Sequence, residues 1–277
     1  MSRYLLCRPD HFGVSYEINP WMKNQIDKVN KATAVEQWQN LYITMSQVCN
    51  LELLPSQQGC PDLVFTANAG LVHESMFIPS RFKNPERQPE EAHFKQWFEQ
   101  QKYTIKSLPD VAFEGAGDAL FSVNKDILWM GHGHRTDELA QKHLQHLLGK
   151  HITVKGLALV NPNYYHLDTC FCPLESGHVV YYPKALDTAS NRLIEAYYKP
   201  SERIVVNDDD AQMFACNMVS ISSSQYNDFN FTAILNDCSD DLYQKLKQAD
   251  HHVIKTPMCE FMKSGGSVKC LTLKLPD

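Results

Sequence analysis

The chain has 277 residues, of which 43% are hydrophobic and 21% charged, and its formal net charge is -6. This composition is typical of a globular protein and excludes disordered, collagenous and coiled-coil chains. A pI near 6.0 disfavours a polyanionic ligand, so we expect no nucleic-acid partner. No apolar run approaches the roughly 18 residues of a membrane span, and the first residues do not resemble a signal peptide. We therefore expect a cytoplasmic protein with no membrane partner.

The cysteines are odd in number and show no short-spaced disulfide framework. This pattern predicts reduced thiols and leaves one of them available as a nucleophile. The nine cysteines are at positions 7, 49, 60, 170, 172, 216, 238, 259 and 270.

Five segments of the chain share one pattern, in which an amphipathic helical run leads through a short turn into a β-rich stretch. In chain order these segments are residues 41–54, 94–108, 144–157, 194–207 and 242–257. The centres of the five β-rich stretches are 52, 49, 51 and 48 residues apart, at Leu53, Ile105, Val154, Val205 and Val253. The sequence therefore contains a repeat of about 50 residues.

Further short β-like runs lie between these segments, at Leu63–Thr66, Ala119–Val123, Ile127–Met130, Val179–Tyr182, Val219–Ile221 and Ser267–Leu273. Each unit is thus predicted to contain strands, one helix and a final strand. Closure of five units around an axis leaves no sheet edge exposed, and requires the last run to join a strand near Tyr4–Cys7. We predict one α/β domain over residues 1–277; the alternative is a two-layer α/β sandwich with coincidental helix spacing.

Polar and reactive residues recur with the same period. Asn68, Asp118, Asp168, Asn217 and Cys270 are separated by 50, 50, 49 and 53 residues. In a fivefold arrangement these positions converge on the axis, where they would form a pocket containing carboxylates, amides and a thiol.

Three local motifs give these positions chemical meaning. In FEGAGD, two glycines allow a tight turn that brings Glu114 and Asp118 into one region. The spacing of His166 and Asp168 places both side chains on one face of an extended segment, where a carboxylate would support a proton-carrying imidazole. Cys270 follows a Gly-Gly turn at the start of the last β-like run and is the candidate nucleophile. The structural alternatives are a packed histidine and a buried, inert cysteine.

Five motifs taken together resemble the guanidine-modifying pentein superfamily, which includes arginine deiminases, dimethylarginine dimethylaminohydrolases and amidinotransferases. They are FTANAG (65–70), FEGAGD (113–118), GHGHRTD (131–137), HLD (166–168) and GGSVKC (265–270). The resemblance implies a five-bladed αβ propeller with pseudo-fivefold symmetry. The N-terminal RPDHFGVSYEINPWM (8–22), together with FTANAG, resembles the ornithine-forming arginine dihydrolases.

The resemblance also implies roles for individual residues. Cys270 would be the nucleophile and His166 the general acid and base. Glu114 and Asp168 would hold the guanidinium of the substrate, and Asp118 joins them as a third carboxylate of the substrate site.

Three further residues would hold the amino-acid end of the substrate. Arg135 would bind its carboxylate, Arg81 is a second candidate for this contact, and Asn19 would contact the α-amino or carboxylate group. One departure from the family pattern is that deiminases usually carry FxRD where this chain has FTAN at 65–68.

The departure suggests a hypothesis for Asn68. A guanidinium is always cationic and binds to carboxylates, whereas the ureido group formed by its hydrolysis is neutral. An amide offers both a donor and an acceptor, so Asn68 would retain and orient the ureido intermediate for a second hydrolysis to ornithine. The structural alternative is that Asn68 only completes a turn.

Several other functions remain open on the sequence alone. They are hydrolysis of dimethylarginine or of other N-substituted arginines, an arginine deiminase that stops at citrulline, an amidinotransferase, and a non-catalytic binding protein of the same fold. The pairs Cys170-x-Cys172 and His132-x-His134 lack common zinc spacings, so we expect neither metal nor cofactor. Residues 83–91 are a lid candidate from their proline and charge content, and a homo-oligomer is compatible with the sequence.

Overall fold

The computed structural model describes residues 1–223, 225–226 and 228–276, in which the strands form five three-stranded sheets. Each sheet contains one antiparallel and one parallel strand pair. The sheets are β15-β1-β2 (Leu273–Leu275, Arg3–Cys7, Asn50–Leu54), β3-β4-β5 (Gly70–His73, Met76–Pro79, Thr104–Ile105), β6-β7-β8 (Ala119–Phe121, Ile127–His132, Thr153–Ala158), β9-β10-β11 (Phe171–Pro173, Val179–Tyr181, Arg203–Val205) and β12-β13-β14 (Val219–Ser222, Phe231–Leu235, His251–Lys255).

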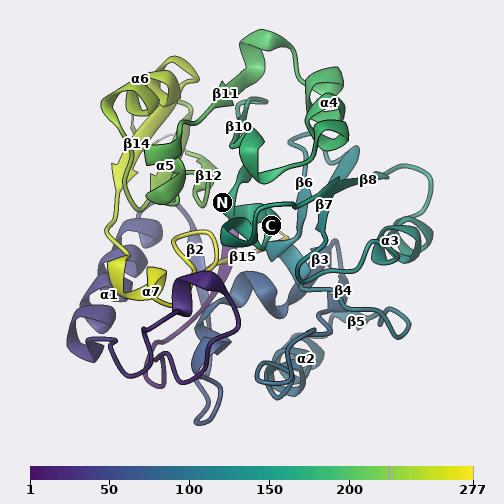
Figure 1. The fold of residues 1–277 in the computed structure, drawn as a ribbon, viewed down its shortest axis with the longest axis vertical. Helices are drawn as coiled ribbons and strands as arrows, with labels where there is room; N and C mark the ends of the chain where they lie inside the picture. Colours follow the sequence, from purple (N-terminus) through teal and green to yellow (C-terminus); the bar gives the residue numbers. More distant parts are fainter. Residues whose placement is uncertain (224, 227, 277) are drawn as a thin grey trace.

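One helix connects the two parallel strands of every sheet, as a parallel pair requires. These helices are α1 (Lys31–Ser46), α2 (Glu90–Gln100), α3 (Ala140–Leu148), α4 (Thr188–Tyr197) and α6 (Asp240–Gln248). Figure 1 shows them spread around the rim of the molecule, with the strands inside them. Two shorter helices are α5 (Asp208–Gln212) and α7 (Cys259–Met262). The mixed α/β fold and the five helix-strand repeats are therefore confirmed.

Capping residues and apolar faces explain where the helices begin and how they pack. The side chains of Asn30, Asp187 and Ser239 accept hydrogen bonds from the backbone N–H groups of the first turns of α1, α4 and α6. On α2, Phe98 is fully buried and stacks on Phe77 of β4 at a centroid distance of 3.6 Å. Helix α2 thus covers the strands of its own unit.

The two ends of the chain meet in one sheet. Strand β15 pairs antiparallel with β1, with Arg3 opposite Leu275 and Leu5 opposite Leu273, and both termini lie near the centre of the view in Figure 1. The prediction that a C-terminal strand joins the N-terminal strand is confirmed, although only Leu273 of the predicted run 267–273 belongs to that strand. The strand itself starts only at Leu273, so Cys270 is not at the start of a strand.

Two predicted strands are wrong in the same way. Residues 63–66 form parts of two 3-10 helices, Pro61–Val64 and Thr66–Ala69, and most of 267–273 forms hydrogen-bonded turns. Val268 and Leu271 in the latter segment are fully buried. Apolar residues can be buried by a compact turn as well as by a strand, and an apolar run of this length does not distinguish the two.

Among the described residues, six further 3-10 helices lie in the connections that link the strands and helices. They lie at Pro20–Met22, Gly115–Gly117, Pro162–Tyr164, Leu167–Thr169, Pro183–Ala185 and Pro200–Glu202. Three residues of the 50-residue period lie in or beside 3-10 helices: Asn68 in Thr66–Ala69, Asp168 in Leu167–Thr169, and Asp118 directly after Gly115–Gly117.

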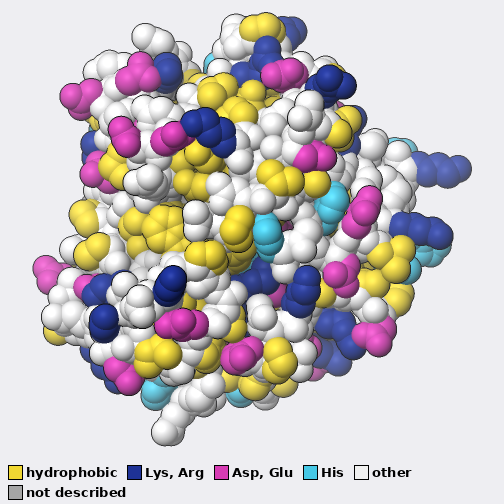
Figure 2. Space-filling view, viewed as in Figure 1, with side chains coloured by type: hydrophobic (Ala, Val, Ile, Leu, Met, Phe, Trp, Pro, Cys, Tyr) yellow, Lys and Arg dark blue, Asp and Glu magenta, His cyan; other side chains and the backbone are white. Residues whose placement is uncertain are grey.

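The remaining general features concern thiols and the surface. All nine cysteines are free, and eight of them are buried. Among the described residues, no helix is long and apolar enough to cross a membrane, and no group of three or more His, Cys, Asp or Glu side chains is arranged to hold a metal ion. Figure 2 shows basic and acidic side chains interspersed over one face of the molecule.

Candidate active site

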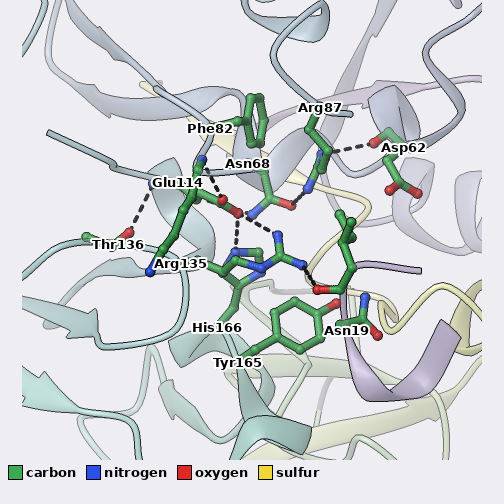
Figure 3. A network of polar contacts seen from close by, with 12 residues as sticks. Asn19, Asp62, Asn68, Phe82, Arg87, Glu114, Arg135, Thr136, Tyr165 and His166 are labelled. Carbon is green, nitrogen blue, oxygen red and sulfur yellow. Dashed lines mark hydrogen bonds and ion pairs between the residues drawn. The ribbon is translucent and has the colours of Figure 1, made fainter. Parts of the chain in front are cut away.

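Glu114 is at the centre of a buried polar network (Figure 3). Its Oε2 accepts a hydrogen bond from Arg135 Nη1 at 3.0 Å and lies 2.7 Å from His166 Nε2. Burial opposes ionisation of Glu114, but the guanidinium of Arg135 and the imidazole of His166 outweigh it, so the pKa of this carboxyl is below its usual range. Glu114 is therefore a carboxylate that is fully withdrawn from solvent.

This carboxylate fixes the tautomer of His166. Burial lowers the pKa of His166 to about 4, although Glu114 acts in the opposite direction. The neutral imidazole then donates its Nε2 proton to Glu114, because a carboxylate can only accept, and its Nδ1 is left as the basic nitrogen. His166 is thus oriented by Glu114 as a base.

The predicted geometry of the HLD motif is wrong. His166 precedes the 3-10 helix Leu167–Thr169, so His166 and Asp168 do not alternate along an extended segment. The turn separates their roles: His166 contacts Glu114, while the two carboxylate oxygens of Asp168 each lie 3.6 Å from the Sγ of Cys270. The turn therefore places each side chain beside a different partner.

Asp118 stabilises the same turn. Its Oδ1 accepts from the backbone N–H of Leu167 at 3.0 Å, and its Oδ2 accepts from the Thr136 hydroxyl at 2.7 Å. Its Oδ2 is 4.0 Å from His166 Nε2. Burial raises the pKa of Asp118 well above its usual value. The FEGAGD turn brings Glu114 and Asp118 into one region as its glycines predicted, with Gly115 at a φ of +62°.

The thiol of Cys270 lies beside an acid and an amide. Asn217 Nδ2 donates to Cys270 Sγ at 3.1 Å. Burial, followed by the nearby Asp168, raises the pKa of the Cys270 thiol. Burial also raises the pKa of Asp168 to about 6, and Lys269, whose Nζ is 4.0 Å from Asp168, counteracts it. The thiol therefore needs a cationic substrate or fixed donors to ionise near neutral pH.

Sequence reasoning missed Arg87. Its guanidinium is almost completely buried, forms a two-point contact with Glu90 at 3.0 and 2.8 Å, and donates from Nη1 to Asn68 Oδ1 at 2.9 Å. Arg87 belongs to the lid candidate 83–91, and the RxxE spacing with Glu90 is a signal that could have identified it.

Arg81 takes a different position. It is about half exposed, pairs with Asp110, and bridges the backbone of Phe113. The structure does not bring Arg81 to the polar network, so Arg87 is the second arginine of the site.

Several of the site residues line a small cavity. Its volume is about 10 Å³, which is room for about one water molecule. The lining residues are Ile18, Asn19, Met22, Asp62, Phe65, Asn68, Arg87, Arg135, Tyr165, His166, Ser264, Gly265, Gly266 and Cys270. The carboxylates of Glu114, Asp118 and Asp168 are buried next to these lining residues.

The N-terminal loop forms one wall of the cavity. Asn19 caps the turn Pro20–Met22 and donates to the carbonyl of Ser264 at 3.0 Å, while Arg135 Nη2 donates to the carbonyl of Ile18 at 3.2 Å. The guanidinium of Arg135 also lies 4.6 Å from the centre of the Tyr165 ring. A substrate larger than water can enter only if some of these contacts open.

Comparisons with known proteins agree with this geometry. The sequence model of the family described as N,N dimethylarginine dimethylhydrolase, eukaryotic, matches residues 8–276. The chain is 46% identical over 276 residues to the bifunctional arginine dihydrolase/ornithine cyclodeaminase AgrE of Nostoc, a match that covers 99% of this chain and 38% of AgrE. It is 33% identical over 274 residues to the N(G),N(G)-dimethylarginine dimethylaminohydrolase of Mycobacterium tuberculosis, covering 99% of this chain and 85% of that protein.

A solved structure gives the same result. The N-terminal domain of ArgZ, the bifunctional relative from Synechocystis, has been solved covalently bound to a reaction intermediate. It matches this chain with a TM-score of 0.95 and 44% identity, covering 100% of this chain and 98% of that one. The chain thus spans about two fifths of the length of the bifunctional relatives. It belongs to the dimethylarginine dimethylhydrolase family, which is one of the guanidine-modifying families that its motifs resemble.

Proposed function

We propose that the chain is a cysteine-dependent arginine dihydrolase, which converts arginine and two water molecules into ornithine, carbon dioxide and two ammonia. The observation that carries the proposal is that Cys270, the His166 imidazole held by Glu114, and the amide of Asn68 border one buried cavity. The likeness to AgrE and ArgZ supports it. Because the chain spans only part of those proteins, the proposal concerns the dihydrolase reaction alone.

Binding of arginine would use the buried charges. The carboxylate of Asp168, next to the thiol, attracts the guanidinium and places its carbon near Sγ. Arg135 and Arg87 are the cations that line the cavity, and they would bind the carboxylate of the substrate together with Asn19. The substrate cation also favours the thiolate form of Cys270.

The neutral His166 then takes the proton of the Cys270 thiol, Sγ attacks the guanidinium carbon, and His166 passes this proton to the nitrogen that departs as ammonia. The resulting covalent S-amidino intermediate is hydrolysed by a water molecule that the neutral His166 activates. This step releases the thiol and gives a ureido group, which completes the first half of the reaction.

Asn68 would determine the second half. A guanidinium can only donate, so its contact with Arg87 fixes Asn68 Oδ1 toward Arg87 and turns Nδ2 toward the backbone carbonyl of Glu114, 3.3 Å away. Asn68 is therefore oriented as a donor, suited to the oxygen of a neutral ureido group. A second attack by Cys270 on that group releases the second ammonia, and hydrolysis then yields ornithine and carbon dioxide.

The test is a product assay by mass spectrometry with arginine, citrulline or dimethylarginine as substrate and Cys270→Ala as control. Ornithine with two ammonia per arginine, absent from the control, is the expected result. Asn68→Asp, Asn68→Ser and Asn68→Ala are expected to lower the ornithine yield, and an unchanged yield in all three removes the role of Asn68. No turnover of any substrate favours a binding protein.

Hydrolysis of dimethylarginine is the second candidate, and the matching family and the M. tuberculosis relative favour it. The same assay separates the two, because dimethylarginine hydrolysis releases dimethylamine and citrulline. Citrulline as the end product from arginine would instead identify an arginine deiminase.

We also propose that residues 1–277 form one catalytic domain whose five sheets close around a pseudo-fivefold axis. The pairing of β15 with β1 supports closure. A cytoplasmic location, supported by nine free cysteines, and a homo-oligomeric state remain predictions. Gel filtration with light scattering tests the oligomeric state.

A further inference from the structure

Asn217 is completely buried between the two turns that carry Cys270 and Asp168. It was singled out only by the 50-residue period, and the reaction described above gives it no role. Its amide makes three contacts with these turns: Oδ1 accepts from the backbone N–H of Cys270 at 3.2 Å, and Nδ2 donates to the carbonyl of Asp168 at 3.0 Å and to Cys270 Sγ at 3.1 Å.

These contacts fix the orientation of the amide. A flipped Asn217 would point its NH2 group at the N–H of Cys270 and its oxygen at the carbonyl of Asp168, which loses both backbone hydrogen bonds. With the oxygen committed to the backbone, the second N–H of Nδ2 can only face Sγ. Sulfur therefore receives a donor whose direction is independent of the substrate.

Hydrogen bonds also fix the backbone of Asn217. Its N–H donates to the carbonyl of Phe214 at 2.9 Å, and its carbonyl accepts from the N–H of Lys269 at 3.3 Å. Phe214 has a φ of +56°, a conformation that non-glycine residues rarely adopt. Its ring packs against Trp21 with centroids 4.5 Å apart. The donor is thus part of a preorganised turn.

Other groups around the thiol act in both directions. The carboxylate of Asp168 opposes ionisation at 3.6 Å from Sγ, whereas the backbone of Ser267 and the ammonium of Lys269 favour it. The ring of Tyr165 and the neutral His166 also line the cavity at Cys270. Of the side chains in this group, Asn217 donates a hydrogen bond directly to sulfur.

We propose that Asn217 is an additional catalytic residue, whose amide stabilises the thiolate of Cys270 and aims Sγ at the substrate carbon. This role rests on the proposed role of Cys270 as the nucleophile. It extends to every guanidine hydrolysis that the site performs, because the contact does not depend on the leaving group.

The experiment measures the thiol directly. In the full-length chain, the rate of Cys270 alkylation by iodoacetamide is followed from pH 6 to 10 by peptide mass spectrometry, which separates Cys270 from the other cysteines. Asn217→Leu removes the donor at similar size, and Asn217→Ala removes it by truncation; neither substitution adds a charge beside the thiol. Asn236 supplies the matched control, since it is also buried and its amide bridges the carbonyl of Met213 and the N–H of Met258.

The alkylation midpoint is the pH at which the alkylation rate of Cys270 reaches half of its maximum. Both Asn217 variants are expected to raise this midpoint by about one to two pH units, as loss of a hydrogen bond to a charged group predicts. At pH 7 the alkylation rate is expected to fall by about 10- to 100-fold. In turnover, kcat is expected to fall more than KM changes. Asn236→Leu and Asn236→Ala are expected to leave the alkylation midpoint unchanged.

A midpoint that moves no further in folded Asn217 variants than in Asn236 variants overturns the proposal. If Asn217→Leu does not fold, the Asn217→Ala variant decides alone. Failure of the proposed function is distinguishable, because turnover retained by Cys270→Ala removes the nucleophile, whereas the alkylation profile reports only on the contact of Asn217 with sulfur.

Discussion

Arg87 and Glu90 form a buried ion pair, and removal of one partner is expected to cost more stability than removal of the other. Both side chains are almost completely withdrawn from solvent, and their two contacts are 3.0 and 2.8 Å long. In Glu90→Leu, Arg87 keeps its charge because a guanidinium cannot lose its proton, so a buried cation loses its direct ion-pair partner. The expected loss in the free energy of unfolding is about 3–5 kcal/mol.

Removal of the arginine has a different consequence. In Arg87→Met, Glu90 can become neutral by binding a proton, and burial already raises its pKa to about 7. The loss is then about 1–3 kcal/mol, for hydrogen bonds alone. A carboxyl whose folded pKa exceeds its unfolded value lowers stability as pH rises through that interval. The loss in Arg87→Met is therefore expected to grow between pH 6 and pH 8.

Urea unfolding at pH 6 and pH 8 measures both variants and the double variant Arg87→Met/Glu90→Leu. The double variant is expected to lose less than the sum of the two single variants, since it leaves neither charge unpaired. Equal losses in the single variants at both pH values, with an additive double variant, would refute the reasoning.

Three further predictions follow from single contacts. Burial lowers the pKa of His251 to about 4, so the folded chain binds fewer protons than the unfolded chain between about pH 4 and pH 6.5. As the pH falls through this interval, the unsubstituted chain is expected to lose up to about 3 kcal/mol more free energy of unfolding than His251→Asn, measured by urea unfolding. A Cβ at Gly117 would lie 2.2 Å from Asn68 Nδ2, so Gly117→Ala is expected to raise citrulline relative to ornithine in the product assay. Trp21 Nε1 donates to the carbonyl of Asn163 at 2.7 Å, and Trp21→Ala is expected to raise KM for arginine about tenfold through loss of this contact and of the ring contact with Phe214.

Each of these expectations can fail separately. Parallel pH profiles of stability for the unsubstituted chain and His251→Asn would show that this imidazole does not titrate differently on unfolding. An unchanged product ratio in folded Gly117→Ala would remove the steric link to Asn68. An unchanged KM in Trp21→Ala would show that the N-terminal loop does not contribute to substrate binding.

The repeat was predictable because the same spacing of apolar residues recurs along the chain. All five expected strand centres, from Leu53 to Val253, lie in strands, and the five predicted helices each connect a parallel pair. Local periodicity reports which face of an element is buried, and this information is contained in the sequence. The turns were harder to predict, because residues 63–66 are buried as 3-10 helices and their apolar pattern resembles that of a short strand.

The site was predicted by residue type better than by contact. The sequence identified Glu114, His166 and Cys270, but it could not show that Glu114 faces the imidazole or that Asp168 faces the thiol. The choice between Arg81 and Arg87 depends on the path of one loop, since the two are six positions apart in the same segment. Such contacts arise from the packing of distant turns and leave no local pattern.

The pairing of β15 with β1 also has a consequence for how the molecule is made. Strand β1 leaves the ribosome before every other strand of the five sheets, yet its antiparallel neighbour β15 is synthesised after all of them. A contact so distant along the chain slows folding, and the first strand has an open edge until then. Since Cys270 directly precedes β15, the nucleophile is expected to reach its acid and amide neighbours only when this last sheet forms. A nascent or truncated chain would therefore carry no reactive site.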